Sequence, residues 1–162
     1  QAMNFLDESY YLVIAGEIYG DEGTYEKLIS KCKNPNIILK NAYLPDEDVK
    51  YYFSAADLCV LPYKKGTQSG VQAIADSFSV PVLVSKNGGL HENLDDGKNG
   101  FVLNDLHVEN LAQKIQDIFS GGKIDIVRNR LNSIQTQKEN EWEKFTEDLL
   151  EFIKTEKEKI KI

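Results

Sequence analysis

Short continuous apolar runs alternate with segments of helical spacing over the first 120 residues of the chain. The runs have the length and composition of strands buried on both faces, and they lie at residues 10–15, 37–39, 58–61, 81–84 and 100–103. Between them, residues 21–33, 45–56, 71–78 and 108–119 have the apolar spacing of amphipathic helices. This alternation predicts an α/β fold, with a Rossmann-like, mainly parallel sheet and helices on both faces.

The chain changes character after residue 120. Gly121-Gly122 interrupts the helical pattern, and from Ile124 onward the sequence is helical and highly charged. The apolar positions of this part are Leu131, Ile134, Trp142, Phe145, Leu149, Phe152 and Ile153. At this length we expect one domain, with an α/β core over residues 1–120 and C-terminal helices over residues 121–162.

The stretch from Asp57 to Gly100 carries the strongest functional signal. It has the pattern of a strand, a polar loop, a helix, a strand and a second polar turn, with the loops at residues 64–70 and 87–89. In a parallel sheet both loops would leave the carboxyl ends of strands, where such sheets bind ligands. Backbone amides at the helix start, Ser69-Gly70-Val71, would point outward with a partial positive charge. The pattern predicts a site for an anion there, above all for phosphate.

Composition excludes several classes of partner. The formal net charge is −7, which argues against a nucleic-acid surface because clustered Lys and Arg hold phosphate backbones. The two cysteines, Cys32 and Cys59, do not form a disulfide pattern, so we expect a reducing compartment and a cytoplasmic location. No apolar run approaches the roughly 20 residues that a membrane-spanning helix needs.

Other common chemistries have little support in the sequence. His91 and His107 are the only histidines and have no cysteine nearby, so a metal site is not expected. The run from Lys64 to Thr67 lacks the spaced glycines of a Walker loop. Ser69 is a poor nucleophile candidate, because its surroundings fall short of a GxSxG turn and no triad partners are evident.

Five segments together carry a resemblance to a known family. They are LVIAG at residues 12–16, the stretch from Asn41 to Tyr63, TQSGV at residues 67–71, the stretch from Pro81 to Val102, and WEKF at residues 142–145. The chain resembles the nucleotide-sugar-binding C-terminal half of retaining glycosyltransferases with the GT-B fold, in the TQSGV-type branch of group 1, or family 4. The resemblance implies transfer of a sugar from a UDP- or GDP-sugar substrate to an acceptor, with retention and without a further cofactor.

The resemblance also assigns roles to residues. Tyr43 and Leu44 would flank the nucleotide base, and the amides of Gly70 and Val71 would face the diphosphate. Thr67, Gln68 and Ser69 would donate or accept neutral hydrogen bonds to the donor. Gly88 and Gly89 would let the backbone approach the donor closely, and Glu92 matches a family glutamate. Two structural alternatives remain open: these glycines only form turns, and Glu92 only caps a helix.

The sequence departs from the family pattern in its acidic residues. Many members carry two glutamates eight positions apart around the first loop and its helix. The corresponding positions here are Thr67 and either Ala75 or Ile74, and none of them is acidic. Asp76, the nearest carboxylate, is either a substitute or a solvated helix residue. The departure leaves a second hypothesis open, a non-catalytic nucleotide-sugar-binding domain with a degenerate site.

A second departure concerns the first strand of the family's domain and a loop with an arginine and a lysine, which the resemblance places before residue 1. We therefore expect a donor-binding fragment that does not catalyse transfer alone. The acceptor, a glycan or a lipid-linked sugar, would bind mostly to an N-terminal half. The resemblance also implies bacterial surface polysaccharide synthesis in a cytoplasmic or membrane-peripheral enzyme.

Without the family's first strand, the strand edges at residues 12–15 and 58–61 would lie open. The sheet would either close around the gap or pair with another copy of the chain.

A third hypothesis is that the chain is a different doubly wound protein, response-regulator-like or epimerase-like.

Overall fold

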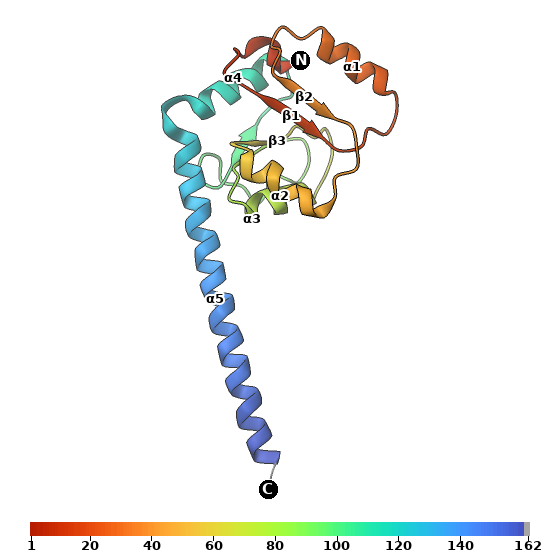
Figure 1. Cartoon of the computed structure of the whole chain (residues 1–162). Helices are drawn as coiled ribbons and strands as arrows, with labels where there is room; N and C mark the ends of the chain where they lie inside the picture. The colour runs from red at the N-terminus through yellow and green to blue at the C-terminus, as the bar shows by residue number, and fades with distance from the viewer. Residues whose placement is uncertain (161–162) are drawn as a thin grey trace.

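The computed structural model describes residues 1–160 as an α/β head with one long helix projecting from it (Figure 1). The strands are β1 (Leu12–Ala15), β2 (Ile37–Lys40), β3 (Cys59–Leu61), β4 (Val82–Ser85) and β5 (Phe101–Leu103). The helices are α1 (Glu22–Ser30), α2 (Asp46–Ala55), α3 (Gly70–Ser77), α4 (Val108–Phe119) and α5 (Lys123–Ile160). Two short 3-10 helices, η1 (Ala2–Phe5) and η2 (Ser120–Gly122), complete the order. The predicted alternation of strands and helices is confirmed.

Local chemistry accounts for where the helices begin and end. Asp21 caps α1, because its carboxylate accepts a hydrogen bond from the Gly23 amide at 3.1 Å. Pro45 precedes α2, whose first turn carries three acidic residues that favour the positive end of a helix. Gly121 has a φ of +68°, which glycine adopts without strain, and it separates α4 from α5.

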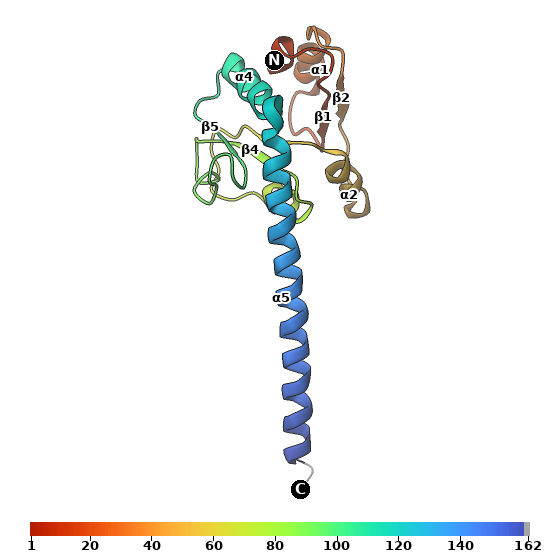
Figure 2. The same cartoon turned by 90° about the vertical axis from the view of Figure 1, so that its left-hand side faces the viewer.

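The strands form two parallel sheets that are not hydrogen-bonded to each other. One sheet pairs β1 with β2, and the other has the order β3-β4-β5. Figures 1 and 2 place β1 on the side of β2 that faces the second sheet. The expectation of open edges at β1 and β3 is confirmed, and the alternative in which hydrogen bonds close the sheet around the gap is wrong for residues 1–160.

The core lies on both faces of the second sheet. On one face, Leu83 of β4 packs with Phe101, Ile118 and Val127, which come from β5, α4 and α5. On the other face, β4 contributes Val82 and Val84 to a cluster with Leu61 of β3 and Ala75 of α3. A smaller cluster of Met3, Leu6 and Ala112 attaches η1 to α4. Burial on both faces explains why β4 is a continuous apolar run rather than an alternating one.

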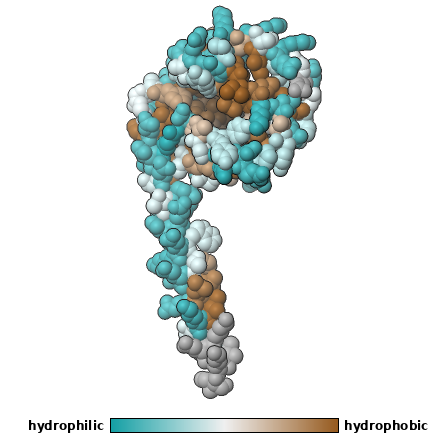
Figure 3. Space-filling view, viewed as in Figure 1, coloured by the Kyte–Doolittle hydropathy of each residue, from teal (hydrophilic) through white to brown (hydrophobic). Residues whose placement is uncertain are grey.

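The long helix α5 packs into the core of the head through its first turns. Ile124, Val127 and Leu131 are buried there, whereas Trp142 and Phe145 are exposed further along the helix. The sequence suggested more than one C-terminal helix, but residues 123–160 form a single one. Figure 3 shows apolar surface on the distal part of this helix and on the head near β1. Within residues 1–160, no helix combines the length and apolarity that crossing a lipid bilayer requires.

A matched pair of substitutions on α5 tests the contrast between its buried first turns and its exposed distal part. Leu131 is 7% exposed and packs in the core, whereas Leu149 is 45% exposed. We expect Leu131→Ala to lower the free energy of unfolding by about 2–5 kcal/mol, because it removes buried methyl groups and leaves a cavity. Leu149→Ala should change it by no more than about 1 kcal/mol. Urea unfolding followed by circular dichroism measures both, and equal losses at the two positions would contradict the packing described.

Candidate functional site

Two loops meet at the carboxyl edge of the second sheet. The first loop, residues 62–69, joins β3 to α3, and the second loop, residues 86–100, joins β4 to β5. Because β3 and β4 are parallel neighbours with Leu61 beside Val84, both loops leave the same edge of the sheet. The predicted placement of the two loops is confirmed.

The two loops touch through their backbones. The Gly89 amide donates a hydrogen bond of 2.8 Å to the Gly66 carbonyl oxygen. Gly88 has a φ of +119°, and a Cβ atom on it would lie 2.3 Å from that oxygen. A Cβ atom on Gly89 would lie 3.3 Å from the Thr67 Cα atom. In this structure, Gly88 and Gly89 thus let the backbone of the second loop lie against the backbone of the first loop.

The start of α3 remains open toward solvent. Ser69 caps the helix, since its hydroxyl oxygen accepts a hydrogen bond of 3.3 Å from the Gln72 amide. No side chain in the described residues is recorded as an acceptor for the amides of Gly70 or Val71. A Cβ atom added to Gly70 would meet nothing within 4 Å, and Val71 is exposed. These two amides are thus available to an anion at the positive end of a helix.

The polar side chains around this helix start differ in exposure. Thr67 and Gln68 are exposed, and Ser69 is half-buried. Three lysines of the two loops, Lys64, Lys65 and Lys86, are also exposed. None of the three makes an ion pair recorded in the described part of the chain. They place positive charge beside the loops of a chain that is acidic overall.

Glu92 lies in a turn at residues 90–93 rather than at the start of a helix. The alternative that it caps a helix is therefore wrong. Its Oε1 atom is 3.6 Å from the position that a Cβ atom on Gly89 would take, so the side chain lies over the glycine pair. His91 beside it is half-buried, and its Nδ1 atom is buried with no hydrogen-bond partner in the described residues.

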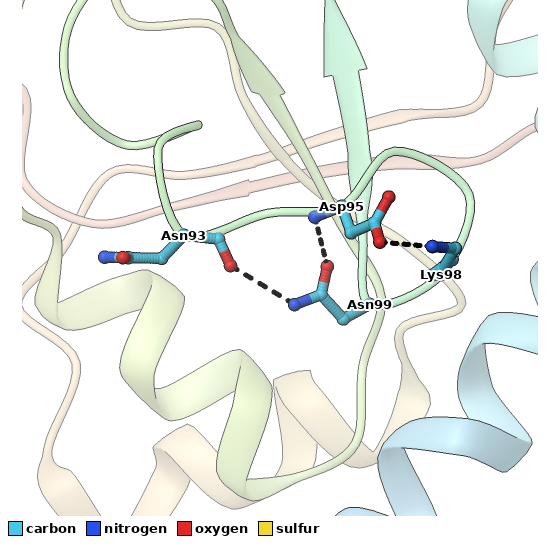
Figure 4. A network of polar contacts seen from close by, with 4 residues as sticks. All are labelled: Asn93, Asp95, Lys98 and Asn99. Atoms are coloured by element: carbon cyan, nitrogen blue, oxygen red, sulfur yellow. Dashed lines mark hydrogen bonds and ion pairs between the residues drawn. The ribbon is translucent and has the colours of Figure 1, made fainter.

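The far end of the second loop is held by its own polar contacts (Figure 4). The Asn99 side chain accepts a hydrogen bond from the Asp95 amide at 2.7 Å and donates one to the Asn93 carbonyl at 3.2 Å. Lys98 pairs with the Asp95 carboxylate. Asp96 accepts a hydrogen bond from the Val102 amide and one from Lys114. Both carboxylates thus take part in contacts within the protein.

Tyr43 and Leu44 follow β2, in the other sheet. Tyr43 is 68% exposed, whereas Leu44 is half-buried. Nearby, the Ile18 amide donates a hydrogen bond of 2.8 Å to the Asn41 side chain, which joins the segments after β1 and β2. No hydrogen bond recorded for residues 1–160 joins Tyr43 or Leu44 to the two loops. The structure thus brings Gly88, Gly89, Thr67 and Glu92 together.

The positions expected to carry family glutamates have no acidic side chain within the helix. Ala75 is completely buried in the core, and Ile74 is 37% exposed. Asp76 lies six residues beyond Gly70, about 9 Å along the helix axis. Burial raises the pKa of Asp76, with a smaller opposing effect of Lys138. These surroundings favour a packing role for Asp76 over a role at the helix start.

Cys59 is the first residue of β3, at the end of the strand opposite to the two loops. Burial, and to a smaller extent the charge of Asp76, raises the pKa of Cys59 to about 11, so the thiol stays protonated at neutral pH. Among the described side chains, no three residues of the His, Cys, Asp and Glu types are grouped so as to hold a metal ion.

Comparison with known proteins identifies the family. The family model for glycosyl transferases group 1 matches residues 1–120. The chain belongs to this family. The predicted resemblance is thereby confirmed, and the α/β domain with parallel strands matches the C-terminal half of GT-B glycosyltransferases.

Individual relatives are distant in sequence, and the solved structures among them are similar in fold. The D-inositol 3-phosphate glycosyltransferase of Pseudarthrobacter chlorophenolicus is 22% identical over 127 residues, which cover 78% of this chain and 30% of that protein. HepE of Anabaena, solved in complex with UDP-glucose, matches with a TM-score of 0.69 at 19% identity over 84% of this chain and 38% of its own. The C-terminal domain of LpcC, a group 1 family protein of Francisella tularensis, matches with a TM-score of 0.67 at 20% identity, over 79% of this chain and 69% of its own. The chain spans about a third of the length of the first two relatives.

The environment of Asp76 gives a pH-dependent prediction. The pKa of Asp76 is raised in the folded state, so ionisation costs more there than in the unfolded chain. Asp76→Asn should therefore raise the melting temperature at pH 7. This gain should shrink as the pH falls through the raised pKa, and vanish below the unfolded value near 4, where both states hold the proton. Thermal melts between pH 3 and 8 measure it.

Asp148→Asn on the exposed part of α5 serves as the matched control for Asp76→Asn. It should leave the melting temperature nearly unchanged over the same range. A melting temperature that falls in Asp76→Asn at pH 7 would show that the ionised carboxylate stabilises the fold.

Proposed function

We propose that this chain binds the nucleotide-sugar donor of a retaining glycosyltransferase, with a UDP- or GDP-sugar as the substrate. The observation that carries the proposal is the pair of free amides, Gly70 and Val71, at the start of α3, beside two loops in contact. The complex of HepE with UDP-glucose supports it by analogy of fold. A helix start with open amides binds the oxygens of a diphosphate through hydrogen bonds and its partial positive charge.

The remaining predicted residues would supply the other contacts to the donor. Thr67, Gln68 and Ser69 would supply neutral hydrogen bonds to the donor, and the Glu92 carboxylate would accept bonds from sugar hydroxyls above Gly89. Tyr43 offers a flat, exposed ring for stacking on a base, with Leu44 beside it. The exposed lysines of the loops would offset the charge of the diphosphate.

In such an enzyme the domain acts by positioning. It would hold the donor so that the acceptor reaches the anomeric carbon, and it would stabilise the diphosphate as that group departs. The acceptor would be a glycan or a lipid-linked sugar in bacterial surface polysaccharide synthesis, bound mostly by an N-terminal half. The location would be cytoplasmic, or peripheral to the membrane through that half. We expect no turnover by these 162 residues alone.

A second candidate is a domain that binds the donor without transferring it. The neutral residues Thr67 and Ala75 favour it, because the buried Ala75 side chain offers nothing to a ribose hydroxyl. Calorimetry with UDP-, GDP- and ADP-sugars, followed by a turnover assay on the full-length protein, separates the two candidates. Binding without turnover favours the second, and binding with turnover favours the first.

A substitution at Gly70 tests the donor site directly. A side chain at this position meets open space and no strained φ, so Gly70→Leu should fold normally. The leucine would occupy the space that a diphosphate needs. We expect the affinity for UDP or GDP, whichever the unchanged chain binds, to fall at least about tenfold, or about 1.4 kcal/mol, by calorimetry.

Ser77→Leu is the matched control, because it adds the same bulk at the exposed far end of the same helix. It should leave the nucleotide affinity within about twofold of the original. Unchanged affinity in Gly70→Leu, with the fold intact by circular dichroism, would overturn the assignment of the first loop.

We propose in addition that the open strand edges let the chain self-associate. β1 pairs only with β2, carries no charge, and exposes Val13 and Ile14, so its free edge lacks the features that prevent pairing. Light scattering after size exclusion should show dimers at high concentration, and Val13→Lys should reduce them. Tyr19→Lys, which places the same charge in an exposed loop, should not. A chain that stays monomeric at every concentration would refute this association.

A further inference from the structure

The first loop is fixed at two points by residues that follow or end β4. Ser85 is the last residue of β4, it is 1% exposed, and its hydroxyl donates a hydrogen bond to the Tyr63 carbonyl at the base of the first loop. Three residues further along the loop, the Gly66 carbonyl accepts the bond from Gly89. Both hydrogen bonds are accepted by backbone carbonyl oxygens of the first loop, and we call these two points its anchors. They fix the path of the loop backbone independently of the loop side chains.

Gly88 makes the second anchor possible. Its missing Cβ atom leaves room for the Gly66 backbone, whose oxygen would lie 2.3 Å from that atom and whose nitrogen would lie 3.0 Å from it. No real Cβ atom tolerates such a distance, so any side chain at Gly88 must push the first loop away. The displacement would pass along Thr67 and Ser69 to the start of α3, because only three residues separate Gly66 from Gly70.

The hydrogen bond to Tyr63 explains why a serine is found at position 85. The neighbouring β4 residues Val82, Leu83 and Val84 are buried and apolar, and a hydroxyl in their place is unfavourable unless it finds a partner. The partner it finds is the first carbonyl after Pro62, where the chain turns from β3 into the loop. Because Ser85 is almost completely buried, it cannot itself touch a ligand.

We propose that Ser85 and Gly88 are positioning residues of the donor site: through the Tyr63 and Gly66 carbonyls they hold the first loop so that the Gly70 and Val71 amides are ready for a diphosphate. This inference rests on the proposed donor binding. It adds that the site depends on Ser85 of β4 and Gly88 of the second loop, which act through the first loop. Preorganised amides bind an anion better than amides that must first be ordered.

A matched pair at Ser85 tests the hydroxyl alone. Ser85→Thr and Ser85→Val add the same methyl group to the core, and they differ in that only threonine can donate to the Tyr63 carbonyl. We expect Ser85→Val to bind UDP or GDP about tenfold more weakly than Ser85→Thr, at temperatures where circular dichroism shows both folded. Threonine should restore most of the original affinity.

A second pair separates steric displacement from backbone strain. Gly88 and Gly97 both lie in the second loop with positive φ, at +119° and +78°, but a Cβ atom on Gly97 meets nothing within 4 Å. Alanine is strained at both positions, whereas only Gly88→Ala collides with the first loop. Gly88→Ala should weaken nucleotide binding at least about tenfold, and Gly97→Ala should leave it within about twofold.

Nuclear magnetic resonance provides a readout that needs no bound nucleotide. In Ser85→Val and Gly88→Ala, the amide resonances of Gly70 and Val71 should shift, and in Ser85→Thr and Gly97→Ala they should not. Equal affinities within both pairs, or unshifted amides in the first two variants, would overturn the positioning role. If the unchanged chain binds neither UDP nor GDP, the proposed function fails, and the amide shifts still decide whether Ser85 and Gly88 hold the first loop.

Discussion

Burial of β4 on both faces is the constraint on which the rest of this structure depends. All four of its residues are almost completely enclosed, between the α4 and α5 cluster on one side and the α3 cluster on the other. It runs parallel to β3 and β5, with Val84 beside Leu61 on one side and beside Val102 on the other. That direction brings two loops to one edge, where the Gly66 and Gly89 backbones meet.

The donor-site proposal follows from how little side-chain chemistry this edge contains. No cysteine lies in either loop, and the Asp95 and Asp96 carboxylates make contacts within the protein. What remains are backbone amides, exposed lysines and the Glu92 carboxylate. Such a set holds an anionic ligand rather than reacting with it, which suits a domain that positions a donor and leaves the chemistry to the reacting sugars.

The rest of the molecule is less constrained than the second sheet. β1 and β2 are attached to it through η1 and α4, where the Gln116 side chain donates a hydrogen bond to the Phe5 carbonyl, and not through strand pairing. The distal half of α5 exposes Trp142, Phe145 and Leu149. Both regions leave apolar side chains exposed, so they are the parts of the molecule that could associate with another surface without first unfolding.

The sequence by itself determined the order and type of the elements, because apolar runs and helical spacing are local properties: β4 and α4 lie within a residue of their expected bounds. It also located both loops and, through the family resemblance, the residues around Gly70. Only the tertiary structure decided that β1 and β3 do not pair, that Glu92 lies in a turn, and that Gly88 makes room for Gly66. The last contact joins residues 22 positions apart, and Ser85 and Tyr63 are equally distant in sequence. Ser85 lies just beyond the strand expected at residues 81–84. Its partner could not be read from the sequence, since hydrogen bonds between loops depend on how strands are placed side by side.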